Sequence, residues 1–276
     1  MNNIFIHVGL RKTATTWLQN ELFQNIENIN YIAKNESNYP NWLIKWHYLD
    51  DYAFEMHIEE IKNSFFSLVN ENKINILSSE AFTNTSVIYS QANRIKKIVP
   101  NAKVIITLRN PIDVIKSHYK LDLQDGINFL ELEKYLDWER TPYDLFKRKP
   151  IYLPDFFYNE NIKYYQNLFG KENVLILRYE DMKNNPDSYF TSLSTFLNIN
   201  IDHNLFKLNK KTNESNRDDI AMLKLKNMKS FLSDNIDCDF SEINISEKCS
   251  FTDTIMPDKL RIKLEKYFEG KCYGYY

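Results

Sequence analysis

Four short runs of apolar residues predict four β-strands, at 3–8, 74–78, 103–108 and 173–177. The residues of each run are apolar at consecutive positions, which is typical of strands that are buried on both faces. The segments between and after the runs have helix-compatible spacing and predict helices at 15–25, 52–70, 86–99, 111–121 and 155–169. Buried strands that alternate with helices predict an α/β fold with a central parallel β-sheet flanked by helices.

Two longer connections, at 27–51 and 122–154, are irregular in pattern and rich in Trp and Tyr. Long connections in compact domains are often functional, so we expect both insertions to form walls or lids of the substrate site. The last third of the chain is mostly helical in pattern, with helices predicted at 217–232 and 258–268. No shift in composition divides the chain, and we expect a single domain over residues 1–276.

Composition and charge exclude several classes of protein. The 35 Lys and Arg residues nearly balance the 37 Asp and Glu residues, which gives no electrostatic case for a nucleic-acid or anionic membrane partner. No segment approaches the roughly 20 apolar residues that span a bilayer. The three cysteines lack zinc-type spacing, and we expect a cytoplasmic protein with reduced thiols. With only five glycines, a glycine-rich dinucleotide loop is excluded.

A cluster of cations and hydroxyls follows the first predicted strand. Residues 9–16 read GLRKTATT and lead directly into a predicted helix. Free backbone N–H groups and the helix dipole favour a phosphate or sulfate at such a turn, where Lys12 adds a mobile charge. The alternative is a threonine-capped helix with surface cations. The turn is not a Walker A loop, because Arg11 stands where that loop needs glycine.

A second candidate anion site follows the third predicted strand. Arg109 stands at the carboxyl end of that strand, and Pro111 is suited to the first turn of a helix. Ligands of open α/β sheets bind at the carboxyl ends of the strands, and an arginine there can hold a phosphate through two N–H donors. Considered alone, Arg109 is better explained by an ion pair with an acid such as Asp113.

The two segments together resemble a known family. GLRKTATTWLQ at 9–19 and LRNPIDVIKSHY at 108–119 are similar to the two donor-binding motifs of sulfotransferases that use 3′-phosphoadenosine-5′-phosphosulfate (PAPS). The resemblance extends to about residue 200 and includes LRYEDM at 177–182. It implies a P-loop-like sulfotransferase fold with a helical C-terminal part.

The resemblance also implies a role for each matched residue. Lys12 would contact the bridging oxygen of the phosphosulfate, and the neighbouring hydroxyls would bind the 5′-phosphate. Arg109 and Ser117 would hold the 3′-phosphate. A basic loop that covers the donor in the family has its nearest counterpart at 210–215, including Lys211. The implied donor site therefore comprises Arg11, Lys12, Thr13, Ala14, Thr15, Thr16, Arg109, Ser117 and Lys211.

One position departs from the family pattern. Many members have glycine where this chain has Ala14. Alanine would be strained if that position required a positive φ, so we expect Ala14 to adopt an ordinary helical conformation.

Sulfuryl transfer needs charge stabilisation at the leaving oxygen and a base for the acceptor proton. Lys12 fits the first role. Glu80 follows the second predicted strand and would lie at the same sheet edge, so we select it as the base. His7 is a rival, although its place within the first strand fits a packed histidine equally well. The other histidines considered are His47, His57 and His118.

The acceptor is the least specified part of the reaction. The aromatic segment 39–48 could stack on sugar rings, with Trp138, Arg140 and Tyr143 opposite, but core packing is the commoner use of such residues. We expect a hydroxyl acceptor, a carbohydrate or glycan, and no metal. A P-loop kinase is one alternative, although a magnesium-holding aspartate is not evident. A catalytically silent nucleotide-binding module is the other, and the intact candidate site residues speak against it.

Overall fold

The computed structural model describes residues 3–32, 40–83, 88–124, 132–139, 151–206 and 256–275. The chain divides into two compact units, Met1–Arg109 with Tyr158–Thr212 and Asn110–Phe157 with Asn213–Tyr276. A single domain over the whole chain stays a prediction. The helix expected at 217–232 lies outside the described residues, as does Lys211. In the described part of the chain, no helix is long and apolar enough to cross a membrane.

The first unit contains a five-stranded β-sheet in which all neighbouring strands are parallel. The strand order is β2-β3-β1-β4-β7. The strands are β1 (Ile4–His7), β2 (Ile29–Ile32), β3 (Ile74–Ser78), β4 (Lys103–Leu108) and β7 (Val174–Arg178). The predicted central parallel sheet is confirmed, with all four predicted strands in it.

The segment 27–51 was expected to be irregular, and that expectation is wrong. It contains the edge strand β2 and the helix α2 (Asn41–Tyr48). The strand has only four residues, and its polar Asn30 donates to the side chain of Asn75 and to the carbonyl of Leu68. A short strand interrupted by a polar residue gives little apolar signal, and edge strands are commonly of this kind.

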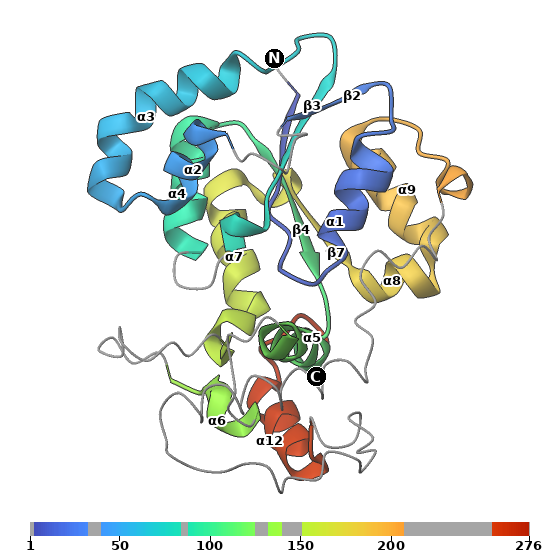
Figure 1. The fold of residues 1–276 in the computed structure, drawn as a ribbon. Coiled ribbons are helices and arrows are strands. Elements are labelled where there is room, and N and C mark those ends of the chain that lie inside the picture. Colours follow the sequence, from blue (N-terminus) through green and yellow to red (C-terminus); the bar gives the residue numbers. More distant parts are fainter. Residues whose placement is uncertain are drawn as a thin grey trace, which may run out of the picture. The chain divides into compact units, whose positions relative to one another are not determined.

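Helices cover both faces of the sheet (Figure 1): α3, α4 and α7 lie on one face, and α1, α8 and α9 lie on the other. Their bounds are α1 (Thr15–Trp17), α3 (Asp51–Phe66), α4 (Ile88–Ile98), α7 (Tyr158–Phe169), α8 (Tyr179–Asn184) and α9 (Pro186–Leu197). A π-helix (Leu18–Phe23) continues α1 without a break. Short 3-10 turns complete the unit at Glu80–Thr83 (η2), Lys171–Asn173 (η4) and His203–Leu205 (η5).

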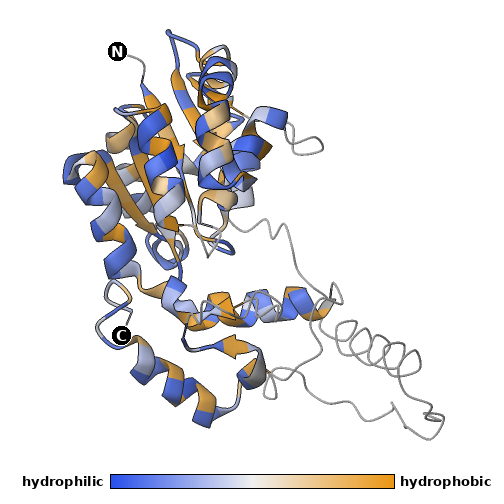
Figure 2. Cartoon of the chain, turned by 90° about the vertical axis from the view of Figure 1, so that its left-hand side faces the viewer, coloured by the Kyte–Doolittle hydropathy of each residue, from blue (hydrophilic) through white to orange (hydrophobic). Residues whose placement is uncertain are grey.

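The hydrophobic core of this unit lies against the strands, where Figure 2 shows the hydrophobic colour concentrated. Alternate strand residues such as Phe5 and Ile76 pack with Trp17 and Phe190 on the α1 and α9 face. The rings of Trp17 and Phe190 meet edge to face with centroids 6.2 Å apart. Because side chains alternate along a strand, His7 shares the face of Phe5 and lies 5.7 Å from the ring of Phe23.

The second unit has its own elements and buried side chains. It contains α5 (Pro111–Gln124), α6 (Leu132–Tyr135), the paired short strands β5 (Leu136–Asp137) and β6 (Ile151–Tyr152), the 3-10 turn η3 (Leu153–Phe156) and α12 (Asp258–Phe268). Phe156 packs against Phe268 at 6.0 Å, and the thiol of Cys272 donates to the Phe156 carbonyl. The helix predicted at 258–268 is confirmed.

Candidate functional site

The candidate site lies at the carboxyl edge of the five-stranded sheet, where the loop 9–16 follows β1. Hydrogen bonds connect this loop to β4 and to the residues that follow β3 and β4. The Thr83 hydroxyl in η2, which follows β3, donates to the carbonyl of Gly9 at 2.8 Å. The Arg109 guanidinium, directly after β4, donates to the carbonyl of Lys12 at 3.0 Å. The chain turns that follow three strands are therefore joined at one edge, as parallel strands require.

The backbone of the loop adopts left-handed conformations at two residues that are not glycine. Lys12 has φ 66° and Ala14 has φ 65°. The expected helical conformation of Ala14 is therefore wrong. Ala14 is the N-cap of α1, and its carbonyl already accepts the first helical hydrogen bond, from Leu18. A left-handed conformation costs a non-glycine residue about 1–2 kcal/mol. Such turns aim successive backbone N–H groups into one concavity, which suits an anion.

The threonines of the loop differ in what their hydroxyls contact. Thr13 is buried and donates to the carbonyl of Leu10 at 2.6 Å, while the Thr107 hydroxyl lies 2.7 Å away. Thr15 is also buried, with longer contacts to the same Leu10 carbonyl and to Thr13. Thr16 is half-buried. The N-cap residue makes no side-chain cap hydrogen bond, so the alternative of a threonine-capped helix is wrong.

Gly9 is required by close packing at the start of the loop. A Cβ atom at this position would lie 2.5 Å from the Thr107 hydroxyl, 2.8 Å from the His7 ring and 2.9 Å from the Thr15 hydroxyl. Real Cβ atoms do not approach other atoms so closely, and the three neighbours are buried and hydrogen-bonded. The loop can therefore leave β1 in this direction only with glycine here.

Arg109 is held by contacts on three sides. Its guanidinium lies 4.7 Å from the centre of the Tyr179 ring, and the Tyr158 hydroxyl donates to its carbonyl at 2.8 Å. Its Nε is buried without a hydrogen-bond partner among the described residues. Within its own unit, no described carboxylate forms an ion pair with it. A guanidinium that lies over an aromatic ring and pairs with no described carboxylate of its own unit is suited to an anionic ligand.

Sequence reasoning did not select Tyr158 or Tyr179 as site residues. Tyr179 lies in the LRYEDM segment, directly after β7, so its position at a strand end was a usable signal. Tyr158 begins α7, and nothing in its local sequence marks it. Both tyrosines position Arg109.

His7 is fully buried, so it has no open path to a substrate. Its Nδ1 lies 2.7 Å from the Ser78 hydroxyl, and its Nε2 lies 3.2 Å from the Thr107 hydroxyl. Burial lowers the pKa of His7 to about 3, which keeps the ring neutral. Of the two interpretations of His7, the structure shows the packed and hydrogen-bonded one.

Glu80 is half-buried at the first position of η2. The Thr83 hydroxyl that contacts the Gly9 carbonyl also contacts the carbonyl of Glu80, at 3.1 Å. The carboxylate is thus carried by a turn that is bonded to the candidate anion loop. Its role as base stays a prediction.

The other histidines lie elsewhere. His47 is buried against Phe82, and burial lowers its pKa to about 4. His57 is half-buried on α3, where it contacts Glu60. His118 lies on α5 in the second unit, 3.2 Å from a carboxylate oxygen of Asp122. His47 and His57 are thus held in the core and at the surface, respectively.

The remaining predicted residues are placed as follows. Arg11 is half-buried in the loop, and Ser117 is half-buried in the middle of α5, which belongs to the second unit. In the aromatic segment, Trp42 and Trp46 are buried against Phe65, so core packing is what the structure shows for both. The described residues contain no group of His, Cys, Asp and Glu that could hold a metal ion.

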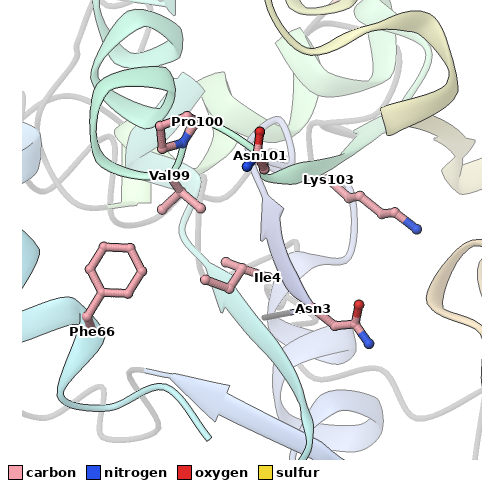
Figure 3. Close-up of a pocket in the computed structure, with 7 residues that line it drawn as sticks. All are labelled: Asn3, Ile4, Phe66, Val99, Pro100, Asn101 and Lys103. Atoms are coloured by element: carbon pink, nitrogen blue, oxygen red, sulfur yellow. The ribbon is translucent and has the colours of Figure 1, made fainter. Parts of the chain in front are cut away.

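A cavity of about 330 Å³ lies at the opposite, amino end of β1. Figure 3 shows its lining, which consists of Asn3, Ile4, Phe66, Val99, Pro100, Asn101 and Lys103. None of the predicted site residues is among them. The cavity and the candidate anion site are therefore separate features of the first unit.

The chain is similar to known proteins over most of its length. Residues 2–271 match the family described as Sulfotransferase domain. A sulfotransferase from Alicyclobacillus acidocaldarius is similar at a TM-score of 0.54 and 19% identity, covering 84% of this chain and 95% of that one. The mouse sulfotransferase SULT7A1 in complex with PAP is similar at a TM-score of 0.49 and 15% identity, covering 99% and 85%. No curated protein matches the sequence.

Proposed function

The chain belongs to the family of sulfotransferase domains, and we propose that it transfers a sulfuryl group from PAPS to a hydroxyl of a carbohydrate or glycan. The observation that carries the proposal is the loop after β1. Lys12 and Ala14 both adopt left-handed conformations there, directly before a helix. Backbone strain at two such residues is kept where a function requires the conformation.

The loop would hold the phosphosulfate end of the donor. Its backbone N–H groups and the hydroxyl of Thr16 offer donors, and Arg11 adds positive charge. Thr15, whose buried hydroxyl contacts the Leu10 carbonyl, stays in the proposed site from the family resemblance. Arg109 would bind the 3′-phosphate through its guanidinium, which is half-buried at the same sheet edge. Ser117 and Lys211 stay in the proposed donor site from the family resemblance.

The proposed reaction forms one bond and breaks one bond. The acceptor oxygen bonds to sulfur, and the bond between sulfur and the bridging phosphate oxygen breaks, which leaves 3′,5′-adenosine bisphosphate (PAP) and a sulfate ester. Lys12 would stabilise the charge that develops on the leaving oxygen. Glu80 would accept the proton of the acceptor hydroxyl. The cations supply the electrostatic stabilisation, so the proposal includes no metal.

A labelled-sulfate transfer assay with PAPS and a panel of sugars, phenols and aliphatic alcohols tests the function. We expect transfer to a sugar hydroxyl, with Glu80→Gln reducing the rate by about 10²-fold or more. Transfer only to phenols would refute the proposed acceptor class. Phosphate transfer from Mg-ATP would instead support the kinase alternative, and PAP binding without any transfer would support the silent module.

Two further parts of the proposal rest on sequence alone. A cytoplasmic location follows from the sparing use of cysteine. The insertions at 27–51 and 122–154 are proposed as walls of the acceptor site, although Trp42 and Trp46 within the first are used for core packing.

A further inference from the structure

The buried polar side chains behind the candidate anion loop form one continuous chain of hydrogen bonds. Its members come from four elements: His7 in β1, Ser78 in β3, Thr107 in β4 and Gln19 in the π-helix after α1, with Thr13 in the loop itself. All five side chains are buried. Polar groups in such a place destabilise the fold unless their hydrogen bonds are satisfied, so the arrangement requires a reason.

The hydrogen bond from the Thr13 hydroxyl to the Leu10 carbonyl determines the donor and the acceptor in each of the other hydrogen bonds of this chain. The Leu10 carbonyl can only accept, so the Thr13 hydroxyl donates its single proton there, at 2.6 Å. The Thr107 hydroxyl, 2.7 Å from Thr13, must then be the donor in that pair. Its proton is thereby used.

The same reasoning assigns the tautomer of the histidine. Since the Thr107 proton is used, the contact of 3.2 Å with His7 requires a proton on Nε2. Neutral histidine then has a bare Nδ1, which accepts from the Ser78 hydroxyl at 2.7 Å. The Ser78 oxygen in turn accepts from the Gln19 amide at 3.0 Å. The order Gln19, Ser78, His7, Thr107, Thr13, Leu10 carbonyl is the one that uses every proton once.

We call this series of hydrogen bonds, from Gln19 to the Leu10 carbonyl, the relay. We propose that it is a positioning device: Thr107 and His7 hold the Thr13 hydroxyl against the Leu10 carbonyl and so keep the loop in its donor-binding conformation. The inference rests on the proposed function, because the ligand of the loop is taken to be PAPS. Its consequence is that the Thr13 hydroxyl cannot donate to the 5′-phosphate in this conformation, since its proton is already used. Thr13 can then contact the donor only through its backbone N–H.

Gly9 gives independent support for the relay. A Cβ atom there would meet both the Thr107 hydroxyl and the His7 ring. The backbone at Gly9 thus packs directly against Thr107 and His7, the two central residues of the relay. A shift of the loop backbone would therefore displace these side chains, and a shift of these side chains would displace the loop.

Replacement of Thr107 tests the relay with a matched pair of variants. Thr107→Val keeps the shape and removes the hydroxyl, whereas Thr107→Ser keeps the hydroxyl. Calorimetric titration of the full chain with PAP should show roughly tenfold weaker binding for Thr107→Val and an affinity within about threefold of the wild type for Thr107→Ser, since one lost hydrogen bond changes an equilibrium by about that factor. Equal affinities of Thr107→Val and the wild type would overturn the proposal, as would equal losses in both variants.

A second test uses the wild-type protein without nucleotide. Its result therefore depends neither on whether the variants fold nor on whether the proposed function is correct. Nitrogen-15 NMR of histidine-labelled protein near pH 7 should show His7 as the neutral Nε2–H tautomer, with a slowly exchanging ring proton. The Nδ1–H tautomer, or a charged ring, would contradict the relay. If the wild type shows the expected tautomer yet binds no PAP, the proposed donor is wrong while the hydrogen-bond order stands.

Discussion

The amino and carboxyl ends of the five-stranded sheet differ in the chemistry of the residues that gather there. The amino end has the cavity shown in Figure 3, lined by apolar groups such as Ile4, Phe66 and Val99. Among the described residues that line it, Lys103 carries a positive charge, and its amine lies 5.4 Å from the centre of the Phe5 ring on the neighbouring strand. The carboxyl end instead has a strained loop with two cations in its sequence, Arg11 and Lys12, and a buried hydrogen-bond relay.

Charge and donor geometry are the features on which the carboxyl end is proposed to hold the nucleotide. An apolar hollow has few groups that can recognise a phosphate. The carboxyl end offers backbone N–H groups in a turn and the half-buried guanidinium of Arg109.

Replacement of Lys12 should have the largest effect. Lys12→Met removes the charge proposed to stabilise the leaving oxygen, and we expect sulfate transfer to fall by about 10²–10³-fold. Lys103→Met removes a cation at the amino end and should leave the transfer rate within about twofold of the wild type. A labelled-sulfate assay compares the two. Equal rates in the two variants would remove Lys12 from the mechanism.

The next largest effect should come from a single added methyl group. Gly9→Ala places a Cβ within 2.5–2.9 Å of three buried polar side chains. Overpacking of this kind typically costs about 1–3 kcal/mol, so chemical denaturation should give a free energy of unfolding lower by that amount. Asn101→Ala, at an exposed position of the amino end, should change it by less than about 0.5 kcal/mol. An unchanged stability of Gly9→Ala would show that the relay has room to move.

The buried neutral histidine should make stability dependent on pH. The pKa of His7 is about 3 in the folded protein and 6.5 for the free side chain, so between these values the unfolded state binds the proton more readily. Stability should therefore be full above about pH 6.5 and fall as the pH is lowered, by about 1.4 kcal/mol per pH unit from this residue. His47, with a pKa of about 4, adds a similar slope down to that pH.

His7→Asn separates the two contributions. Urea unfolding of this variant at pH 6.5, 5.5 and 4.5 should show about half the pH slope of the wild type, whatever the absolute stability of the variant. A slope equal to that of the wild type would mean that His7 is already charged in the folded protein.

The smallest expected effect is a gain in stability. Ala14→Gly relieves the left-handed strain at φ 65°, offset in part by the greater freedom of glycine in the unfolded chain. We expect the free energy of unfolding to rise by up to about 1 kcal/mol. The control Ala92→Gly, in the interior of α4, should lower it by about 1 kcal/mol or more. Loss of stability in both variants would contradict the strain at Ala14.

The sequence predicts the sheet well because each long strand is a run of consecutive apolar residues. The edge strand β2 was missed because Asn30 interrupts its four residues. The conformation of Ala14 was predicted wrongly because it depends on how the chain turns between β1 and α1, which residue type alone does not show. The loop was selected because cations and hydroxyls directly follow a buried strand, and Arg109 was selected through the family resemblance.

The relay could not be predicted, although its members carry a weak signal. Ser78 is the last residue of β3 and Thr107 is the next to last of β4, so each is a hydroxyl near the end of an apolar run. Their meeting at His7 depends on the register of three strands, in which His7 lies beside Ser78 and Ile105. Sequence pattern gives strand positions and does not give register between strands that are far apart in the chain.

We propose that the loop after β1 holds the phosphosulfate end of the donor. A crystal structure of the full chain with PAP would show whether the nucleotide binds there. We expect the oxygens of the 5′-phosphate to lie within about 2.7–3.2 Å of backbone N–H groups between Lys12 and Thr16, with the Thr13 hydroxyl still directed to Leu10. A nucleotide bound away from this loop, for instance in the cavity at the amino end of β1, would contradict it.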